Sequence, residues 1–197
     1  PWRADRNRSA GGTLIEHGVH GLDLLTWMFG PLRRVRACER NLAGHPGIED
    51  YVAAEIELAG GSRAQLVNVW HDMVQRPSNR RLEVFCERAF VASDEDMHGP
   101  ITWQRGDDGA TILDADEVLR RYLTIRGAGG HPQREWFPVP YFVQDLAFVE
   151  SLLAGRPPEP GIRVGLEAQR LAEGVYAAAR SGESVDLGTF AGGSVDP

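Results

Sequence analysis

Hydrophobic positions change their spacing twice along the chain. Near the start they recur three or four residues apart, at Val19, Leu22, Leu25 and Phe29. This spacing predicts a helix over about 15–29, ended by Gly30-Pro31. Alternation in the middle predicts strands at 32–40, 51–58, 64–71 and 82–86, with shorter ones at 88–92, 101–104 and 110–113. Helical spacing then returns in two segments, 140–155 and 164–181.

The order of these elements predicts the fold class. A helix, a run of strands joined by tight turns and two final helices indicate an α+β protein. We expect an open, mostly antiparallel β-sheet with the helices packed on one face. Gly18 and Gly21 each cost about 1 kcal/mol relative to alanine inside the first helix. Another segment should therefore pack closely against that helix.

Composition argues against some classes of binding partner. The 197 residues carry a net charge of −7, which argues against nucleic acid or an anionic membrane as a partner. No apolar run approaches the ~20 residues of a membrane span. Arg33–Arg36 and Arg80-Arg81 fit an exposed sheet face. Cys38 and Cys86 lie in alternating segments, so we expect small buried side chains in a reducing, cytoplasmic environment.

Several motifs are missing from the sequence. All 21 basic residues are arginine, so any mechanism that needs a lysine amine must take it from another chain or domain. There is no Gly-x-Gly-x-x-Gly, no Walker loop and no Cys-x-x-Cys pair. By itself, the chain has no recognisable dinucleotide site. It also opens at Pro1 without an initiator methionine or a signal peptide, and we expect it to be a piece of a longer protein.

The strongest candidate chemistry lies at the start of the first helix. Glu16, His20 and Asp23 are four and three residues apart, which places them along one helix face. A carboxylate beside an imidazole can orient it for proton transfer near neutral pH. The alternative is an acidic residue favoured by the helix dipole, with a solvated histidine.

Other candidates carry less chemical information. His17 with Glu16, His20 and Asp23 could form a metal site, but no second ligand cluster is present and we expect no metal. Trp2, Arg3 and Asp5 could bind a polar substrate, or belong to a frayed terminus. Tyr141 and His131 are further possible substrate contacts. The strand face of Asn68, Trp70 and Asp72, with His71 opposite, is more typical of packing.

The segment Ser9–Trp27 resembles the hallmark segment of the Gfo/Idh/MocA oxidoreductases. A Gly-Gly run, an acidic residue, a histidine and an aspartate recur there at the family's spacing, after a Trp-Arg-x-Asp stretch like Trp2–Asp5. The segments 142–155, 161–182 and Val185–Leu187 resemble the family's closing helices and short last strand. The resemblance extends from Trp2 to Leu187.

The resemblance implies that this chain is the second domain only. Residues 1–190 would be the substrate-binding and oligomerisation domain, and 191–197 a tail. NAD or NADP would be bound mainly by a Rossmann domain outside the chain, which would also supply the family's catalytic lysine in a Glu-Lys-Pro motif. The sheet face would form a homo-oligomer, a dimer or a tetramer.

The resemblance also assigns roles to residues. His20 matches the family's catalytic histidine, and Glu16 matches an acidic residue that is usually aspartate. The implied reaction is oxidation of a sugar, cyclitol or similar polyol, with His20 taking the hydroxyl proton and hydride passing to nicotinamide. Glutamate in place of aspartate moves the carboxylate by about 1 Å. The alternative is a non-catalytic carbohydrate-binding or dimerisation module with the same fold.

Overall fold

The structure of the chain is a computed structural model that describes residues 2–70, 79–94, 99–127 and 139–192. The chain divides into two compact units. Unit 1 comprises residues 1–73 and 160–197, and unit 2 comprises residues 74–159. The candidate catalytic residues lie in unit 1, so its construction decides how the site is positioned.

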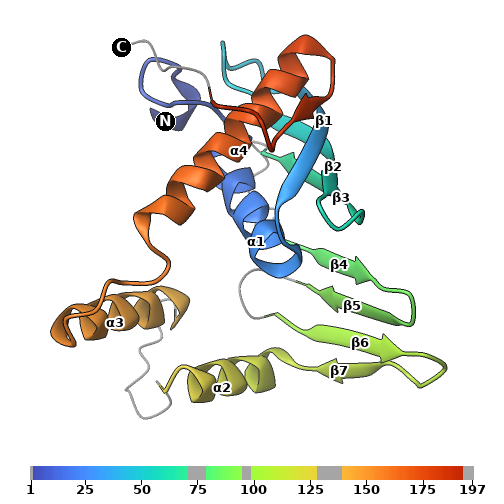
Figure 1. The fold of residues 1–197 in the computed structure, drawn as a ribbon, viewed down its shortest axis with the longest axis vertical. Helices are drawn as coiled ribbons and strands as arrows, with labels where there is room; N and C mark the ends of the chain where they lie inside the picture. Colours follow the sequence, from blue (N-terminus) through green and yellow to red (C-terminus); the bar gives the residue numbers. More distant parts are fainter. Residues whose placement is uncertain (1, 71–78, 95–98, 128–138, 193–197) are drawn as a thin grey trace. The chain divides into compact units, whose positions relative to one another are not determined.

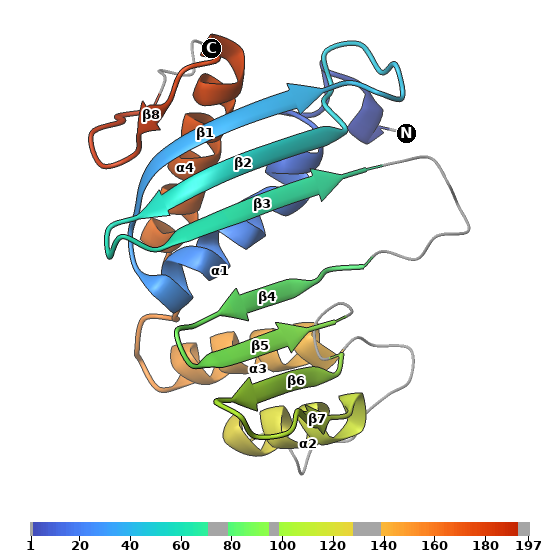
Figure 2. The ribbon, with the colours of Figure 1, turned by 90° about the vertical axis from the view of Figure 1, so that its right-hand side faces the viewer.

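Unit 1 is a four-stranded antiparallel sheet covered on one face by helices (Figures 1 and 2). The strand order is β3-β2-β1-β8, and helices α1 and α4 lie on the same face of the sheet. The elements are η1 (Trp2–Ala4), η2 (Leu14–Gly18), α1 (Val19–Phe29), β1 (Leu32–Arg40), β2 (Tyr51–Leu58), β3 (Arg63–Val69), α4 (Ile162–Ser181) and β8 (Val185–Asp186).

The core of unit 1 follows from strict alternation in its central strand. Every second residue of β2 is buried, from Val52 to Leu58, while the residues between them face the opposite side. Leucines of α1 and a stripe of small and branched residues on α4 pack against that face. Burial of this one face fixes the register of the sheet, because a slip by one residue would expose the whole apolar set.

Unit 2 contains a second antiparallel sheet, with strand order β4-β5-β6-β7 and two helices on one side (Figure 2). Its elements are β4 (Leu82–Phe85), β5 (Ala89–Ser93), β6 (Ile101–Arg105), β7 (Thr111–Leu113), α2 (Ala115–Ile125) and α3 (Val139–Leu153). Helix α2 begins where the Asp114 side chain accepts a hydrogen bond from the Glu117 backbone N–H at 2.8 Å. This is an N-cap of the usual kind.

The α+β class and the antiparallel strands are confirmed. The structure differs in one respect, because the strands form two sheets in two units. Helix α2 was not expected, although Asp114 followed by Glu117 is a sequence signal for a helix start. None of the helices among the described residues is long and apolar enough to cross a membrane.

The expectation that both cysteines are buried is wrong. Cys38 and Cys86 are both exposed. Cys38 lies on β1 three positions after the buried Val35, so alternation places it on the opposite, outer face. Cys86 follows the last residue of β4, where the chain turns toward β5. The arginines at 33, 34 and 36 are exposed, as expected.

Two glycines of α4 have opposite surroundings. At Gly174, an added Cβ would overlap the buried side chain of Leu187, which follows β8. At Gly165, no heavy atom lies within 4 Å of the Cβ position. The first glycine therefore permits close packing of α4 against Leu187, whereas the second is an unfavourable residue at an exposed position of the same helix.

We expect Gly174→Ala and Gly165→Ala to change stability in opposite directions. Gly174→Ala should lower the free energy of unfolding by about 1–3 kcal/mol, since Leu187 must be displaced. Gly165→Ala should raise it by about 0.5–1 kcal/mol through helix propensity. Urea unfolding followed by circular dichroism measures both. Equal effects of the two substitutions would contradict the packing role of Gly174.

A polar cluster interrupts the inner side of the unit 1 sheet. Glu39 on β1 is partly buried close to Glu49, and Arg180 and Tyr176 of α4 face the same region. The Arg180 guanidinium lies 5.9 Å from the centre of the Tyr176 ring. Burial and the nearby Glu49 raise the pKa of Glu39 above its ordinary value, and Arg180 only partly opposes this.

The raised pKa of Glu39 predicts that this residue affects the stability of the fold in a pH-dependent way. A carboxyl whose pKa is higher in the folded state stabilises the fold below its ordinary pKa, and this stabilisation is lost as pH rises through the folded value. Glu39→Gln should therefore raise the free energy of unfolding at pH 7, by less than about 0.5 kcal/mol for a partly exposed group.

The increase in the free energy of unfolding caused by Glu39→Gln should disappear at acidic pH, where Glu39 is protonated in both the folded and the unfolded state. Thermal unfolding at a series of pH values measures it. Glu87→Gln is the matched control, because Glu87 is exposed in unit 2. A loss of stability in Glu39→Gln at pH 7 would contradict the prediction.

Candidate functional site

The helix that carries the candidate residues begins with a π-turn. Residues Leu14–Gly18 are π-helical, and the backbone N–H of Val19 bonds to the carbonyl of Leu14. The regular α-helix starts only at Val19. A helix in this segment is confirmed, but its first turn is wider than an α-helical one.

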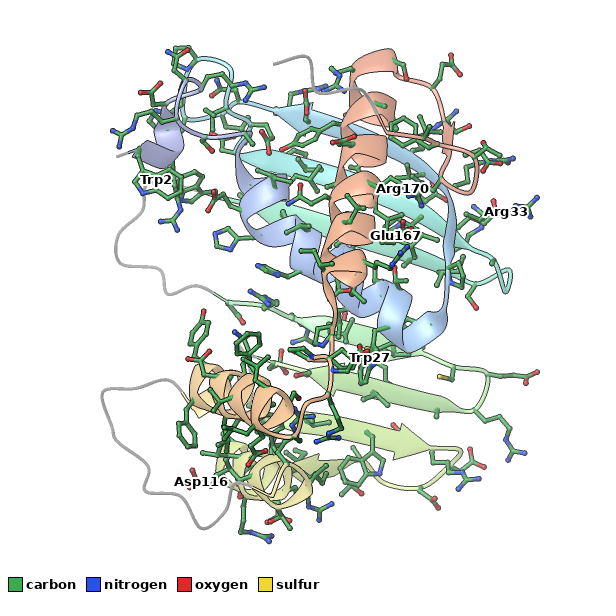
Figure 3. The ribbon with its side chains drawn as sticks, turned by 60° about the vertical axis from the view of Figure 1, so that its left-hand side comes forward. Trp2, Trp27, Arg33, Asp116, Glu167 and Arg170 are labelled. Atoms are coloured by element: carbon green, nitrogen blue, oxygen red, sulfur yellow. The ribbon has the colours of Figure 1, made fainter. Side chains whose placement is uncertain are left out.

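The carboxylate of Glu16 is paired with Arg3. Arg3 Nε lies 2.8 Å from Glu16 Oε2, and the Arg3 guanidinium lies 4.7 Å from the centre of the Trp2 ring. Figure 3 shows Trp2 at η1. The structure thus brings together three of the predicted residues, with an exposed indole, a cation and a carboxylate in series.

Both histidines of the segment are exposed to solvent. His17 lies in the π-turn and His20 in the first turn of α1. Within the described part of the chain, no hydrogen bond or ion pair joins Glu16 to His20. The orientation of His20 by Glu16 therefore stays a prediction.

The other predicted site residues are less closely connected to this segment. The Asp5 carboxylate accepts a hydrogen bond from the Asn7 backbone N–H at 3.0 Å, so it closes its own turn. Tyr141 is 50% exposed on α3, in unit 2. His71, Asp72 and His131 lie outside the described residues. No group of three or more metal-ligating side chains is found in the described segments.

Close packing at the helical glycines is confirmed. An added Cβ at Gly18 would lie 2.8 Å from Leu14 Cδ1 and 3.0 Å from Asn68 Oδ1. At Gly21 it would lie 2.9 Å from Leu66 Cδ1. Side chains of β3 therefore determine how closely the helix at Gly18 and Gly21 approaches the sheet. Asn68 Oδ1 is buried and has no hydrogen-bond partner among the described residues.

Sequence reasoning missed the residue that holds the helix start. The carboxylate of Glu49, which is 7% exposed, accepts hydrogen bonds from the backbone N–H groups of Gly12 at 2.8 Å and Leu14 at 3.0 Å. The hydroxyl of Tyr176 donates to the same carboxylate at 2.8 Å. Burial and the Glu49 charge raise the pKa of Tyr176, so the phenol stays a donor. No local motif links residues so far apart in the chain.

A cavity of about 230 Å³ lies between α1 and α4. Asp23, Arg163 and Glu167 are among its lining residues. Glu167 is held by Arg170, one turn further along α4 (Figure 3). Glu16 and His20 do not line this cavity. The candidate catalytic residues therefore lie outside this cavity, with His20 exposed to solvent and Glu16 partly exposed.

Comparisons with known proteins agree with this fold. Residues 1–92 match the family model of the GFO/IDH/MocA C-terminal domain. No curated protein sequence matches the chain.

Solved structures resemble almost the whole chain. An oxidoreductase domain protein from Kribbella flavida is 20% identical with a TM-score of 0.78, and the match covers 95% of this chain and 54% of that one. The aldose-aldose oxidoreductase from Caulobacter crescentus, complexed with glycerol, is 22% identical with a TM-score of 0.70, covering 94% and 50%.

A levoglucosan dehydrogenase in complex with NADH is 14% identical, with a TM-score of 0.77 and coverage of 95% and 53%. The chain thus spans about half the length of these structures. The resemblance seen in the sequence is confirmed: residues 1–92 match the model of the GFO/IDH/MocA C-terminal domain, and the whole fold is that of the matching oxidoreductase structures.

Proposed function

We propose that this chain is the substrate-binding and catalytic half of an NAD(P)-dependent oxidoreductase that acts on a sugar, a cyclitol or a similar polyol. One observation carries the proposal. In a segment that matches this family's model, the helix start presents the exposed imidazole of His20, and the carboxylate of Glu16 on the same helix start is paired with Arg3, which lies over the Trp2 ring. Support for the substrate class comes from the levoglucosan dehydrogenase and the glycerol-bound aldose-aldose oxidoreductase.

In this proposal each side chain has a separate task. The neutral imidazole of His20 accepts the proton of a substrate hydroxyl. Trp2 offers an apolar wall for a sugar ring, and Arg3 and Glu16 offer a donor and an acceptor for its other hydroxyls. Asp5 and Tyr141 are proposed as further substrate contacts. An exposed histidine does not exclude water, so a second surface must close over it during the reaction.

The nicotinamide cofactor would be held by another part of the protein. Among the described residues all paired strands are antiparallel, so there is no parallel βαβ unit to place a dinucleotide at a helix N-terminus. When bound, NAD(P)⁺ supplies the hydride acceptor for the carbon that carries the hydroxyl. This chain would contribute the proton acceptor and the substrate contacts.

We further propose that the outer face of the unit 1 sheet joins copies of the chain. Val67 and Val69 on β3 are 59% and 50% exposed. Cross-strand pairing places Ala53 between Val67 and Cys38, and Tyr51 beside Val69. These side chains form an apolar area on a face that α1 and α4 do not cover (Figure 2). Such areas are typical of interfaces.

A non-catalytic carbohydrate-binding or dimerisation module is the second candidate. It is favoured by one observation, the pairing of Glu16 with Arg3, which leaves His20 without a described carboxylate partner. An indole beside a charged pair offers an apolar wall and hydrogen-bonding groups for a sugar, without any proton transfer. The two candidates differ in whether His20 is required for turnover.

Replacement of His20 by alanine in the intact protein tests the enzymatic proposal. Loss of the proton acceptor should lower kcat for polyol oxidation by about 10²–10⁴-fold. Because His20 is exposed, the circular dichroism spectrum and Tm should stay unchanged. His45→Ala, in the loop between β1 and β2, is the matched control and should keep full activity. Unchanged turnover in His20→Ala would favour the binding module.

A charge placed on the outer sheet face tests the assembly. Val67→Asp should dissociate the homo-oligomer, because an unpaired carboxylate at an apolar interface is strongly unfavourable. Leu42→Asp is the control, since Leu42 is 70% exposed in a loop outside this face. Sedimentation velocity at micromolar concentration measures both. A wild-type protein that sediments as a monomer would refute the proposed interface.

A further inference from the structure

We propose that Glu49 and Tyr176 form a positioning pair that sets the orientation of His17 and His20; this inference rests on the proposed function. Neither residue belongs to the exposed site. Both act through the backbone at the start of η2, where Glu49 is 7% exposed and the Tyr176 hydroxyl donates to its carboxylate from α4.

Glu49 holds three successive backbone amides. Its two carboxylate oxygens accept from Gly12 and Leu14, and its backbone carbonyl accepts from Thr13 at 3.0 Å. The first N–H groups of a helix have no partner within the helix and are usually capped by a local side chain. Here Thr13 makes no such side-chain hydrogen bond. The cap therefore comes from a residue 35–37 positions further along the chain.

The Gly11-Gly12 pair makes room for these contacts. A Cβ at Gly12 would overlap the backbone carbonyl of Glu49, and a Cβ at Gly11 would overlap the hydroxyl of Tyr176. Any larger residue would push the helix start away from the carboxylate. Each glycine of this motif thus corresponds to one member of the positioning pair.

The π-turn follows from anchoring the helix at both ends. Residues 12–14 are held by Glu49, and α1 is held by Leu22 and Leu25 in the core. We infer that the segment between these two anchors is one residue too long for regular α-helical turns. The π-turn at Leu14–Gly18 accommodates the extra residue. If the anchor at residues 12–14 were released, this turn could relax to α-helical geometry. Each residue of an α-helix advances about 100° around the axis, so Glu16 and His17 would change direction relative to His20.

Tyr176 makes the arrangement depend on α4. The Tyr176 hydroxyl donates to the same Glu49 oxygen that accepts from the Leu14 backbone N–H. Removal of the hydroxyl therefore weakens the hold of Glu49 on the helix start but leaves the backbone hydrogen bonds in place. Val175, the preceding residue, is fully buried in the core cluster. A comparison of substitutions at Tyr176 and at Val175 therefore distinguishes loss of the contact with Glu49 from general loss of α4 packing.

The experiment compares Tyr176→Phe and Glu49→Gln with Val175→Ala in the intact protein. The readouts are Tm and the imidazole ¹³Cε1–¹Hε1 NMR resonances of His17 and His20, assigned from single histidine substitutions. We expect Tyr176→Phe to lower Tm by about 3 °C and to shift both resonances. Val175→Ala should lower Tm by about 5 °C and leave both resonances in place.

Unshifted resonances in Tyr176→Phe would overturn the positioning role, as would equal shifts in Val175→Ala. If Glu49→Gln fails to fold, Tyr176→Phe still decides the question. In the intact protein, Tyr176→Phe should lower kcat about tenfold and leave KM within twofold, with levoglucosan and glycerol as probes. An intact wild-type protein that oxidises neither probe nor other polyols would refute the proposed function alone, because the resonances test the positioning role independently of turnover.

Discussion

The buried carboxylate of Glu49 is the contact on which the arrangement of unit 1 depends. A carboxylate removed from water is strongly unfavourable unless donors surround it. Here the donors come from the helix start and from α4, while Glu49 itself leads into β2. Three segments distant in sequence must therefore be in place together before the charge is satisfied. This requirement couples the position of the site helix to the packing of α4 on the sheet.

Close approach of the site helix to its neighbours follows from the same constraint. A helix start held so near the loop before β2 has no space for side chains on its contacting face. Glycine at positions 12 and 18 removes them where the loop and β3 approach. The helix loses some intrinsic stability at Gly18, which tertiary packing must offset. The result is a turn whose backbone is fixed on one side while its polar side chains face solvent on the other.

The sequence predicted the parts of this arrangement that depend on local pattern. Alternation identified β2, and Gly30-Pro31 identified the end of α1. The prediction that Cys38 is buried is wrong, because alternation shows only that successive side chains point to opposite faces of a strand. Packing decides which of the two faces is buried. The Glu16–His20 spacing was interpreted as an α-helical face, but the π-turn depends on contacts at both ends of the segment. The role of Glu49 is non-local, so no spacing in a single sequence could have indicated it.

The two acidic residues near the site differ in how easily they can change partner. Arg3 is about half exposed, and an ion pair at such a position contributes no more than about 1 kcal/mol. In the proposed function, substrate hydroxyls would therefore replace Arg3 at Glu16 with little loss of stability. Glu49 is buried, and the loss of any donor would leave part of its charge unsatisfied. The fold thus combines a buried carboxylate with fixed donors and a more exposed one whose partner can be exchanged, and the proposed substrate-binding role would use the second while the first keeps the helix start in place.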